Sequence, residues 1–504
     1  MTLSSDDAKR IAPFVSNLDR DVFALAGLPE EVVAVLFAYY SRSREDLRTN
    51  LAKLLVEDEL GSAESGVSNF RFASEKAKAF HEKWVVGYGH ASVAEHAVVH
   101  LALENVSIVA TKTIEDMRLG SYTEKSTRYV AFDEGSFQSL PSLPPELAAR
   151  YEETCRGLFR TYLSLIPRVE EKVRAAIPRG EKQPERAYDA SMRAKTFDLL
   201  RGLLPASTKT NLGLTANARS IETLLSKMLA SPLAEVTSLA EEMHKESQAV
   251  APTLVKYVAK NAYRVALRET VAPMTALALP PASYVAVEPR SGVDLIDYDG
   301  NGLDRVIASL AIEAPEMTMS AEQIAGAVSS VSLDEKTELL RAALVDRGRF
   351  DPVPRAFEAA RLAFEIVVDY GAWRDLQRHR LLSPFVQRLG CELGYVVPPE
   401  LEDLGFADEF RAALDGVVPV WRAMVDECPW EAQYVVPLAY RMRTTWHMNL
   451  REWFHVVELR SSKAGHPSYR AIAQEMYRAL VNVWPWLEGT ARVDLGEYRF
   501  GRVE

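Results

Sequence analysis

The stretch Arg378-His379-Arg380 places two permanent cations and one titratable imidazole in consecutive positions, and Ser383 adds a hydroxyl three residues later. Arginine suits phosphate binding because its planar fork makes paired, charge-assisted hydrogen bonds. Upstream, alternating apolar residues over 361–368 predict a strand, and 372–377 predicts a short helix, so the triplet falls near a helix end. Cations are also favoured there for structural reasons alone. By itself, the triplet therefore fits an anion site and a solvated helix end equally well.

A second segment of the chain repeats part of this pattern. Residues 118–129 contain the same Arg-x-x-Ser spacing. Each of the two segments is followed further along by an Asn-x-Arg triplet, at 217–219 and at 449–451. Because the same marks recur in the same order, the sequence indicates an internal duplication with two diverged copies.

The segment 124–128, which reads Glu-Lys-Ser-Thr-Arg, is a second candidate for binding an anion. It combines small hydroxyl side chains, closely spaced backbone N–H groups and one arginine, which is the composition of a phosphate-binding loop. The alternative is that Arg128 only pairs with Glu124 on a surface turn.

Composition sets the broad class of the protein. The chain has 504 residues, 48% hydrophobic and 26% charged, which is typical of a globular protein with two or more domains. With a net charge of -11, no general nucleic-acid surface is expected, so an anion site must be a local cluster of cations. The three cysteines form no Cys-x-x-Cys pair, which argues against a metal site and favours a reducing compartment. Without a signal peptide or an apolar run of roughly 20 residues, we expect a cytoplasmic protein with no membrane partner.

The order of predicted elements favours an α+β fold, because helices are mixed with two short sheets. No Gly-x-Gly-x-x-Gly follows a strand, which argues against a Rossmann nucleotide site. Strands are expected at 97–103, 293–298 and 361–368, helices at 146–176, 188–202, 220–268 and 467–485, and a loop at 396–408. The proline-rich stretch 270–292 is the expected linker, which divides the chain into domains 1–285 and 286–504.

These marks resemble the hallmark of the flavin-dependent thymidylate synthases, Arg-His-Arg-x-x-Ser-x-Asn-x-x-Ser-x-Arg. The second copy matches the front of the hallmark, at Arg378, His379, Arg380 and Ser383, and the first copy matches the back, at Arg118, Ser121, Ser126 and Arg128. The family's upstream His-x-x-x-x-Glu-His segment resembles residues 90–96, and its later Leu-Pro…Asn-Ala-Arg-Ser segment resembles 204–220. The resemblance implies two tandem domains, each a small, mainly antiparallel sheet with flanking helices.

The two copies depart from the family on opposite sides of its site. The first copy carries other residues at the front and late-arginine positions, namely Asp116, Met117 and Met228. The second copy carries other residues at the loop and at the position of Arg201, namely Arg388, Gly390 and Gln433. Random loss of site residues in a nonfunctional copy would not be expected to divide in this way between the two sides of one site. We therefore expect one composite site per pair of copies and a dead reciprocal site.

The resemblance also implies roles for individual residues. It implies substrate contacts from Glu124, Lys125, Ser126, Thr127, Arg128, Arg201, Arg378 and Arg460, and it makes Arg460 the catalytic residue that stabilises charge developing on the uracil ring. It implies FAD as cofactor, bound by Ser41, Ser92, Glu95, Arg378, His379, Arg380, Asn449, Arg451, His455 and His466. For each of the last two histidines, a structural role is an equal alternative.

The implied activity is methylation of dUMP, with methylenetetrahydrofolate as carbon donor, reduced FAD as hydride source and NADPH among the substrates. Two alternatives stay open: a flavin- and nucleotide-binding homologue with a changed substrate, and a noncatalytic pseudo-enzyme. The first is favoured by Asp375, where the family has Gln, and by Thr123 and Phe385 at the hallmark Asn. The resemblance further implies a homodimer whose four copies form a pseudo-tetramer.

Overall fold

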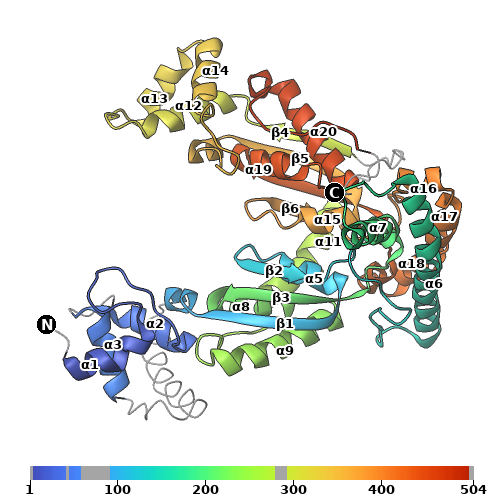
Figure 1. Ribbon diagram of the computed structural model, residues 1–504, viewed down its shortest axis with the longest axis horizontal. Helices are drawn as coiled ribbons and strands as arrows, with labels where there is room; N and C mark the ends of the chain where they lie inside the picture. Colours follow the sequence, from blue (N-terminus) through green and yellow to red (C-terminus); the bar gives the residue numbers. More distant parts are fainter. Residues whose placement is uncertain (1–3, 41–44, 58–90, 279–291, 499–504) are drawn as a thin grey trace. The chain divides into compact units, whose positions relative to one another are not determined.

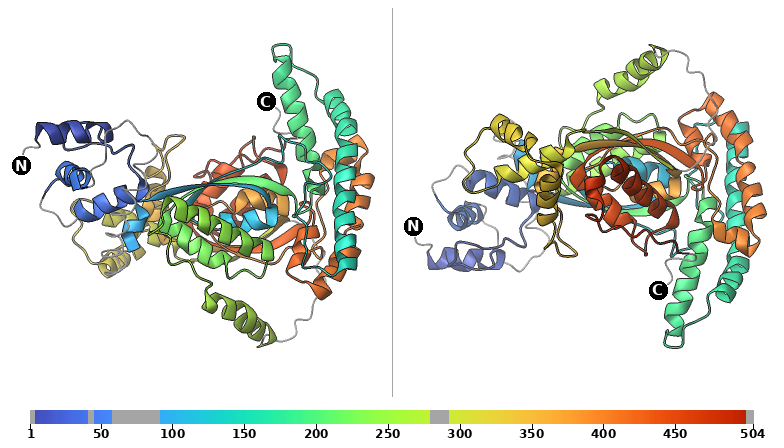
Figure 2. Two further views of the ribbon diagram at one scale, coloured as in Figure 1. Left: turned by 90° about the horizontal axis from the view of Figure 1, so that it is seen from below. Right: turned by 90° about the horizontal axis from the view of Figure 1, so that it is seen from above.

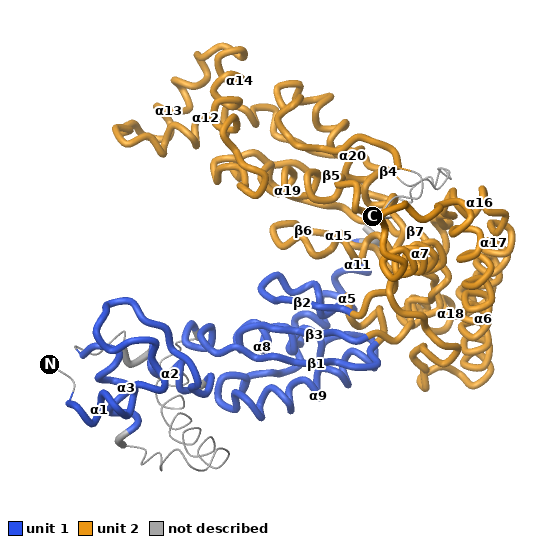
Figure 3. Tube along the Cα trace, viewed as in Figure 1, with its two compact units in different colours: residues 1–106, 113–124, 211–283 blue, residues 107–112, 125–210, 284–504 orange. Residues whose placement is uncertain are grey.

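The computed structural model describes residues 4–40, 45–57, 91–278 and 292–498, which form two compact units (Figure 3). Unit 1 comprises residues 1–106, 113–124 and 211–283, and unit 2 comprises residues 107–112, 125–210 and 284–504. The central segment 125–210 therefore packs with the second half of the chain. The expected boundary between residues 285 and 286 separates two sequence copies, and it stays a prediction.

Unit 1 is built on a three-stranded sheet with strand order β1-β3-β2 (Figure 1). The strands are β1 (Val98–Ser107), β2 (Gly120–Glu124) and β3 (Lys209–Asn217), and β2 pairs antiparallel with β3. Helices α8 (Ala218–Met228) and α9 (Ala234–Val250) pack against each other. Helix α9 lies along the sheet in Figure 1 and in the left view of Figure 2. The apolar stripe of α8 is buried, because Ile221, Leu224, Leu225 and Met228 recur at helical spacing.

Short helices complete unit 1 on either side of this sheet in the sequence. The N-terminal ones are α1 (Ser5–Ile11), α2 (Glu30–Tyr40) and α3 (Leu47–Glu57), which share a small apolar core that includes Ile11, Leu36 and Leu51. The later ones are α10 (Ala262–Ala266) and α11 (Ala272–Ala278). The expected continuous helix over 220–268 is thus wrong, because its apolar periodicity is interrupted between α8 and α9 and again after Val250.

Unit 2 contains a four-stranded antiparallel sheet with strand order β4-β5-β7-β6. The strands are β4 (Gly292–Tyr298), β5 (Arg361–Asp369), β6 (Ser383–Val386) and β7 (Arg441–Asn449), and the predicted strand over 361–368 is confirmed. Helices α19 (Leu450–Arg460) and α20 (Pro467–Val483) pack on this sheet, and helix α15 (Tyr370–Leu376) follows β5 directly. The two small sheets among helices confirm the α+β fold class.

The remaining helices of unit 2 form two groups. After β4 come α12 (Gly302–Ile312), α13 (Ala321–Ser329) and α14 (Leu333–Ala342), the last two started by serine capping boxes. The long α6 (Pro145–Ala176) packs against α7 (Glu185–Leu200), α16 (Pro399–Leu404), α17 (Ala407–Asp415) and α18 (Val418–Glu427). The expectation of a loop over 396–408 is therefore wrong in part, because Pro399 begins α16, where a missing N–H costs nothing. No helix in the ranges described is both long and apolar enough to cross a membrane.

The two sheets follow the same plan. The order β1-β3-β2 corresponds to β5-β7-β6, and in both sheets the middle strand runs directly into an 11-residue helix. Asn217 and Asn449 cap these two helices by accepting a hydrogen bond from the backbone N–H three residues later. This correspondence fits a chain made of two related parts.

Equivalent segments of the two parts pair with each other inside unit 2. Pro205 and Pro437 hold the same place in the two sequence copies and form an antiparallel bridge. The N–H of Ala206 donates to the carbonyl of Val436, and the N–H of Leu438 donates to the carbonyl of Leu204, both at 2.9 Å. The pairing joins the segment after α7 to the segment before β7, so residues from both halves of the chain come together there.

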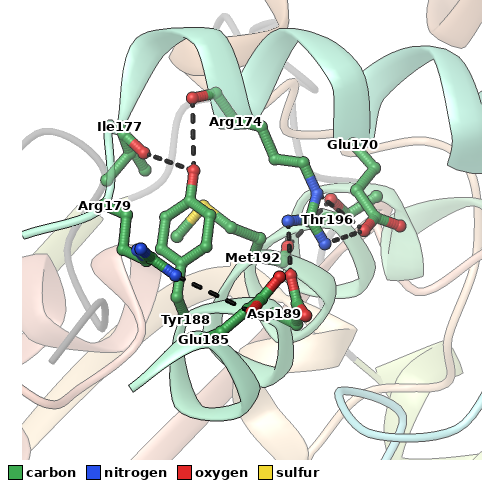
Figure 4. Close-up of polar contacts among 9 residues, drawn as sticks. All are labelled: Glu170, Arg174, Ile177, Arg179, Glu185, Tyr188, Asp189, Met192 and Thr196. Carbon is green, nitrogen blue, oxygen red and sulfur yellow. Dashed lines mark hydrogen bonds and ion pairs between the residues drawn. The ribbon is translucent and has the colours of Figure 1, made fainter. Parts of the chain in front are cut away.

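The helical hairpin of α6 and α7 is fixed by a polar cluster, drawn in Figure 4. Arg174 on α6 contacts Glu170 and Asp189, each at 2.7 Å, and the hydroxyl of Tyr188 donates to the carbonyl of Ile177 at 2.8 Å. These contacts hold α7 against α6, so they set the position of Asp198 and Arg201 at the other end of α7.

A buried ion pair ties α7 to α16. Lys195 Nζ donates to Glu400 Oε1 at 2.9 Å, and the two side chains are only 2% and 5% exposed. Removing one partner leaves the other charge buried without compensation, whereas an apolar pair of similar volume removes both costs.

Lys195→Met should therefore destabilise unit 2 by about 3–5 kcal/mol. The double variant Lys195→Met/Glu400→Leu should recover most of that loss. Urea denaturation followed by tryptophan fluorescence would compare the three proteins. A loss below about 1 kcal/mol for the single variant would show that the pair is solvated rather than buried.

Candidate functional site

Three cationic or titratable side chains surround the carboxylate of Asp198, which is 3% exposed. Arg128 Nε lies 3.7 Å from Asp198 Oδ1, Arg201 Nε lies 3.6 Å away, and His466 Nε2 lies 3.9 Å away. The two arginines come from the first half of the chain and the histidine from the second, yet all four residues belong to unit 2. The structure thus brings the predicted loop arginine and Arg201 together with a residue of the other copy.

Local structure explains how these side chains meet. Asp198 and Arg201 are three residues apart at the end of α7, so they share one helix face. His466 caps α20, because its Nδ1 accepts the backbone N–H of Ser468 at 3.2 Å. With Nδ1 as acceptor, the neutral ring carries its hydrogen on Nε2, which is the atom that faces Asp198.

The arginines of this cluster are incompletely satisfied. Arg128 Nε and Arg201 Nη2 are buried atoms without a hydrogen-bond partner among the described residues. The distances from Arg128 Nε and Arg201 Nε to Asp198 Oδ1 exceed hydrogen-bonding range. Leaving a charged donor buried and unpaired costs free energy. An anion with several acceptor oxygens, such as a phosphate, would satisfy both guanidinium groups.

The loop that carries Arg128 has the expected character. Thr127 is buried, and the Ser126 hydroxyl accepts the backbone N–H of Arg128 at 3.2 Å. The Thr210 hydroxyl donates to the carbonyl of Lys125 at 3.4 Å, which ties the loop to β3. Arg128 points to Asp198, so its contacts go beyond the surface pair with Glu124 that was the alternative.

A cavity of about 30 Å³ lies beside Arg201, between α7 and the starts of α15 and α20. Asp369, Ser468 and His466 contribute to its wall. Asp369 caps α15 by accepting the N–H of Ala372 at 2.8 Å, and its burial raises the pKa of its carboxyl, an effect that Arg201 and Ser468 partly oppose. The volume holds a few atoms, so it suits the end of a ligand rather than a whole nucleotide.

The predicted Arg-His-Arg triplet follows the end of α15, and its members face different environments. Arg378 and Arg380 are exposed, and Arg378 pairs with Asp375 at 2.9 Å. His379 is buried, with Nδ1 3.0 Å from Glu452 Oε1 and with Nε2 accepting a hydrogen bond from Arg460 Nε at 2.9 Å. The helix-end expectation is confirmed, and the histidine is engaged inside the protein.

Arg460 connects this second cluster to the first. Its Nη2 donates to the carbonyl of Asp375 at 2.5 Å, and its guanidinium lies 5.5 Å from the ring centre of Tyr469. The ring of Tyr469 lies 6.1 Å from that of His466, which faces Asp198. A continuous series of contacts therefore runs from Arg460 to Arg128.

Burial controls the charge of the second cluster. It lowers the pKa of His379 to about 3, and the neighbouring Arg460 and Arg378 lower it further in the same direction. Burial also raises the pKa of Glu452 to about 7, and it lowers the pKa of His455, whose ring lies 5.1 Å from that of His379. His379 is consequently neutral at physiological pH.

The other residues implied for the cofactor, and Glu124 implied for the substrate, have internal contacts or lie elsewhere. Asn449 caps α19, and Arg451 donates to Glu358 Oε1 at 2.7 Å and to the carbonyl of Val353 at 3.1 Å. Ser92 and Glu95 belong to unit 1, where Glu95 pairs with Arg219 at 2.5 Å. Glu124 ends β2, also within unit 1, and Ser41 lies outside the described residues.

The corresponding positions of the reciprocal side are closed by local contacts. Arg388 donates to the carbonyl of Pro429 at 3.3 Å and lies over Trp430, the residue that corresponds to Asp198. Gln433, in place of Arg201, accepts the N–H of Leu389 at 3.3 Å. In unit 1, Asp116 is paired with Lys227. These contacts use the polar groups that a ligand would need.

Three residues in these clusters were not predicted from the sequence. Asp198 could have been found from its spacing to Arg201, which is that of a helical ion pair. Glu452 follows Asn449 by three residues and so looked like an ordinary helix start. Asp369 ends a strand, and no sequence signal separates it from a plain helix cap.

A larger hollow of about 880 Å³ lies among the N-terminal helices of unit 1. Phe23, Phe37 and Arg48 line it, and Arg48 stacks on Phe23 at 3.7 Å. None of the predicted site residues that the structure describes belongs to its wall. The candidate site therefore consists of the two connected clusters in unit 2.

Comparison with known proteins identifies relatives of the whole chain and of parts of it. A "UPF0159 protein" of Chlamydia muridarum is 35% identical, over 99% of this chain and 97% of its own length. A protein of the same description from Thermoplasma acidophilum is 32% identical, over 86% and 92%. A flavin-dependent thymidylate synthase of Pyrococcus furiosus is 25% identical over 32% of this chain and 57% of its own length.

Among solved structures, the flavin-dependent thymidylate synthase of Helicobacter pylori, complexed with FAD and dUMP, aligns with 40% of this chain and 99% of its own, at 19% identity and a TM-score of 0.29. The family described as "Thymidylate synthase complementing protein" matches two segments, residues 35–253 and 294–486. The two matched segments fit the two-part arrangement seen in the sheets, and together they span most of the sequence. The chain belongs to the thymidylate synthase complementing protein family.

Proposed function

We propose that this protein is an FAD-dependent thymidylate synthase that uses one composite site per pair of diverged copies. The observation that carries the proposal is the pair of buried guanidinium nitrogens without a hydrogen-bond partner among the described residues, Arg128 Nε and Arg201 Nη2, which a series of contacts connects to Arg460. Family membership supplies the reaction class. Two such chains, paired as a homodimer, would provide the four copies that form a pseudo-tetramer.

The nucleotide would bind along the series of contacts between the two clusters. Its phosphate would satisfy Arg128 and Arg201, and residues 125–127 would add hydroxyl and backbone donors. The uracil ring would lie toward Arg460, whose guanidinium would stabilise the negative charge that develops on the base. Asp198 would hold the arginines in place when no nucleotide is bound.

The residues at the end of α15 fit the phosphates of FAD. Arg378 and Arg380 expose two guanidinium groups there, and His455 exposes its ring nearby on α19. Asn449, Arg451 and His466 would support the cofactor through the elements that they fix. When bound, the reduced flavin would supply the hydride for the methyl group derived from methylenetetrahydrofolate, with NADPH as reductant.

A second candidate is a flavin- and nucleotide-binding homologue with a changed substrate. Asp375 favours it, because its carboxylate pairs with Arg378 at 2.9 Å. The added carboxylate weakens the attraction of this region for a phosphate. An assay of thymidylate formation with dUMP, methylenetetrahydrofolate, NADPH and FAD decides between the two: thymidylate formation is expected, and a yellow protein that forms none would favour the second.

Asp198→Asn should make the protein more dependent on a bound anion, because Arg128 and Arg201 then lose the carboxylate that faces both of them. We expect a loss of about 1–3 kcal/mol of stability at low salt and a larger thermal stabilisation by inorganic phosphate than in the parent protein. Asp189→Asn, on the same helix but in an exposed pair with Arg174, is the control. Equal responses to phosphate in both variants would contradict the role of Asp198.

Arg128→Ala should weaken deoxyuridylate binding by about 2–4 kcal/mol, because it removes a charge-assisted contact in a buried site. FAD content should stay largely unchanged. The matched control is Arg388→Ala, which removes an arginine stacked on Trp430 and should change binding little. Calorimetric titration measures all three proteins, and equal losses in both variants would contradict the division into one live and one dead side.

Arg460→Lys should lower turnover more than nucleotide affinity, since a group acting on developing charge contributes mainly in the transition state. A loss of about 10²–10³ in kcat is expected, with KM changed much less. Steady-state kinetics with dUMP as the varied substrate gives both constants. An increase in KM alone would assign Arg460 to ground-state binding instead.

A further inference from the structure

Glu452 occupies the first turn of α19 but does not behave as a capping residue. Its backbone N–H donates to Asn449 Oδ1 at 2.9 Å, as in a normal cap. In a capping box, its side chain would turn back to the N–H of the cap residue. Instead, Oε1 lies 3.0 Å from Nδ1 of His379, and both side chains are buried, at 4% and 1% exposed.

The contacts on the two sides of the His379 ring fix the place of its proton. Arg460 Nε carries a hydrogen and can only donate, so His379 Nε2 must present a lone pair. The single proton of the neutral ring is then on Nδ1, where it is donated to Glu452 Oε1. This holds whether Glu452 is ionised or carries a proton on Oε2, because Oε1 accepts in either case.

We propose that Glu452 is a positioning residue that sets the tautomer of His379 and, through it, the orientation of Arg460. The inference rests on the proposed function for its catalytic meaning but not for its geometry. Without an acceptor at Glu452, no hydrogen bond stabilises the tautomer with its proton on Nδ1. In the other tautomer, the proton on Nε2 would point at the Nε–H of Arg460, so two donors would face each other. The guanidinium would then lose one of its fixed contacts.

The contacts of Arg460 also determine which part of its guanidinium group is left to meet a ligand. Nε binds His379, and Nη2 binds the carbonyl of Asp375. These two nitrogens form one edge of the planar guanidinium, so the protein uses that edge to orient the group. A ligand would meet the end formed by Nη1 and Nη2, where the charge is presented without a change in side-chain conformation.

The electrostatic surroundings favour this arrangement over a charged histidine. Burial, Arg460 and Arg378 all oppose protonation of His379, and His455 lies at its side. Glu452 is surrounded by His379, His455 and Arg460, and Glu458 acts on His455 from the same helix. Adding a proton to His379 would place two donors, Nε2–H and the Nε–H of Arg460, against each other.

A triple-mutant cycle in the full-length protein, without any ligand, tests whether Glu452 acts on Arg460 through His379. Glu452→Leu and Arg460→Met are made singly and together, first with His379 present and then with His379→Phe. Hydrogen–deuterium exchange of the α19 amides reports the local opening equilibrium. Residues 452 and 460 should be coupled by about fivefold or more in the opening constant when His379 is present, and by less than about twofold in its absence. Coupling that survives His379→Phe, or is absent throughout, overturns the proposal.

Conservative variants keep the test decisive if those proteins do not fold. Glu452→Gln retains an acceptor for Nδ1–H and should preserve most of the protection of α19, whereas Glu452→Leu should not. With Arg460→Lys, Glu452→Gln completes a milder cycle with the same expected pattern. Loss of protection in Glu452→Gln as large as in Glu452→Leu would show that the acceptor atom is not what matters.

The pH dependence gives a readout with a definite sign. Because the pKa of Glu452 is raised to about 7 from the ordinary 4.5, its contribution to stability is complete below pH 4.5 and is lost as pH rises through about 7. Glu452→Gln lacks this titration. The protection of α19 in the parent protein, relative to Glu452→Gln and after correction for chemical exchange, should therefore fall across that range. A flat difference would show that the Glu452 carboxyl is not held in the buried position beside His379, which would overturn the proposal.

Activity then separates this proposal from the proposed function. If thymidylate is formed, Glu452→Leu should lower kcat at least tenfold with little change in KM, and Glu452→Gln should retain most of the parent rate. If the parent protein forms no thymidylate, the proposed function is wrong. The mutant cycle still shows whether Glu452 acts on Arg460 through His379. If the parent protein is active but residues 452 and 460 are not coupled, the positioning role of Glu452 is wrong and the proposed function stands.

Discussion

The antiparallel pairing of residues 202–207 with 434–439 is the constraint on which the candidate site depends. It joins equivalent segments of the two halves, with Pro205 opposite Pro437. Backbone hydrogen bonds are directional and short, so they fix the register of the two segments. Once that register is set, the end of α7 lies beside the start of α20, and Asp198 meets His466.

Desolvation shapes the chemistry that this register assembles. Cations and carboxylates are placed in a region where burial makes each charge expensive unless it has a partner. In the first cluster, Asp198 balances Arg128 and Arg201 only in part, which leaves guanidinium donors for an anion. In the second, His379 avoids the cost by staying neutral, and this makes it an acceptor for Arg460.

The two halves have a common plan but different polar contents at matching places. Asp198 on one side corresponds to Trp430 on the other, and Arg201 corresponds to Gln433. The aromatic ring and the amide find partners nearby, since Arg388 stacks on Trp430 and Gln433 accepts the N–H of Leu389. The single carboxylate of Asp198 cannot fully satisfy the two guanidinium groups beside it. The difference explains how a symmetric fold can support a single site.

The sequence by itself determined the local elements and the identity of the key cations. Alternation along β5 and the asparagine caps before α8 and α19 are short-range signals, so the strand and both helix starts follow from neighbouring residues. The family marks identified Arg128, Arg201 and Arg460 by type and spacing. The expectations of a loop over 396–408 and of a continuous helix over 220–268 were wrong, although local signals marked both: Pro399 begins α16, and the apolar periodicity is interrupted between α8 and α9 and again after Val250.

Only the tertiary structure decided which side chains meet. Asp198 and His466 are far apart in the sequence, and so are His379 and Glu452, so no periodicity or spacing relates them. Their contacts depend on the pairing between the two halves and on the packing of α19 against the end of α15. The tautomer of His379 depends on atoms from two other elements, because a proton's position on a ring is set by the partners on both sides.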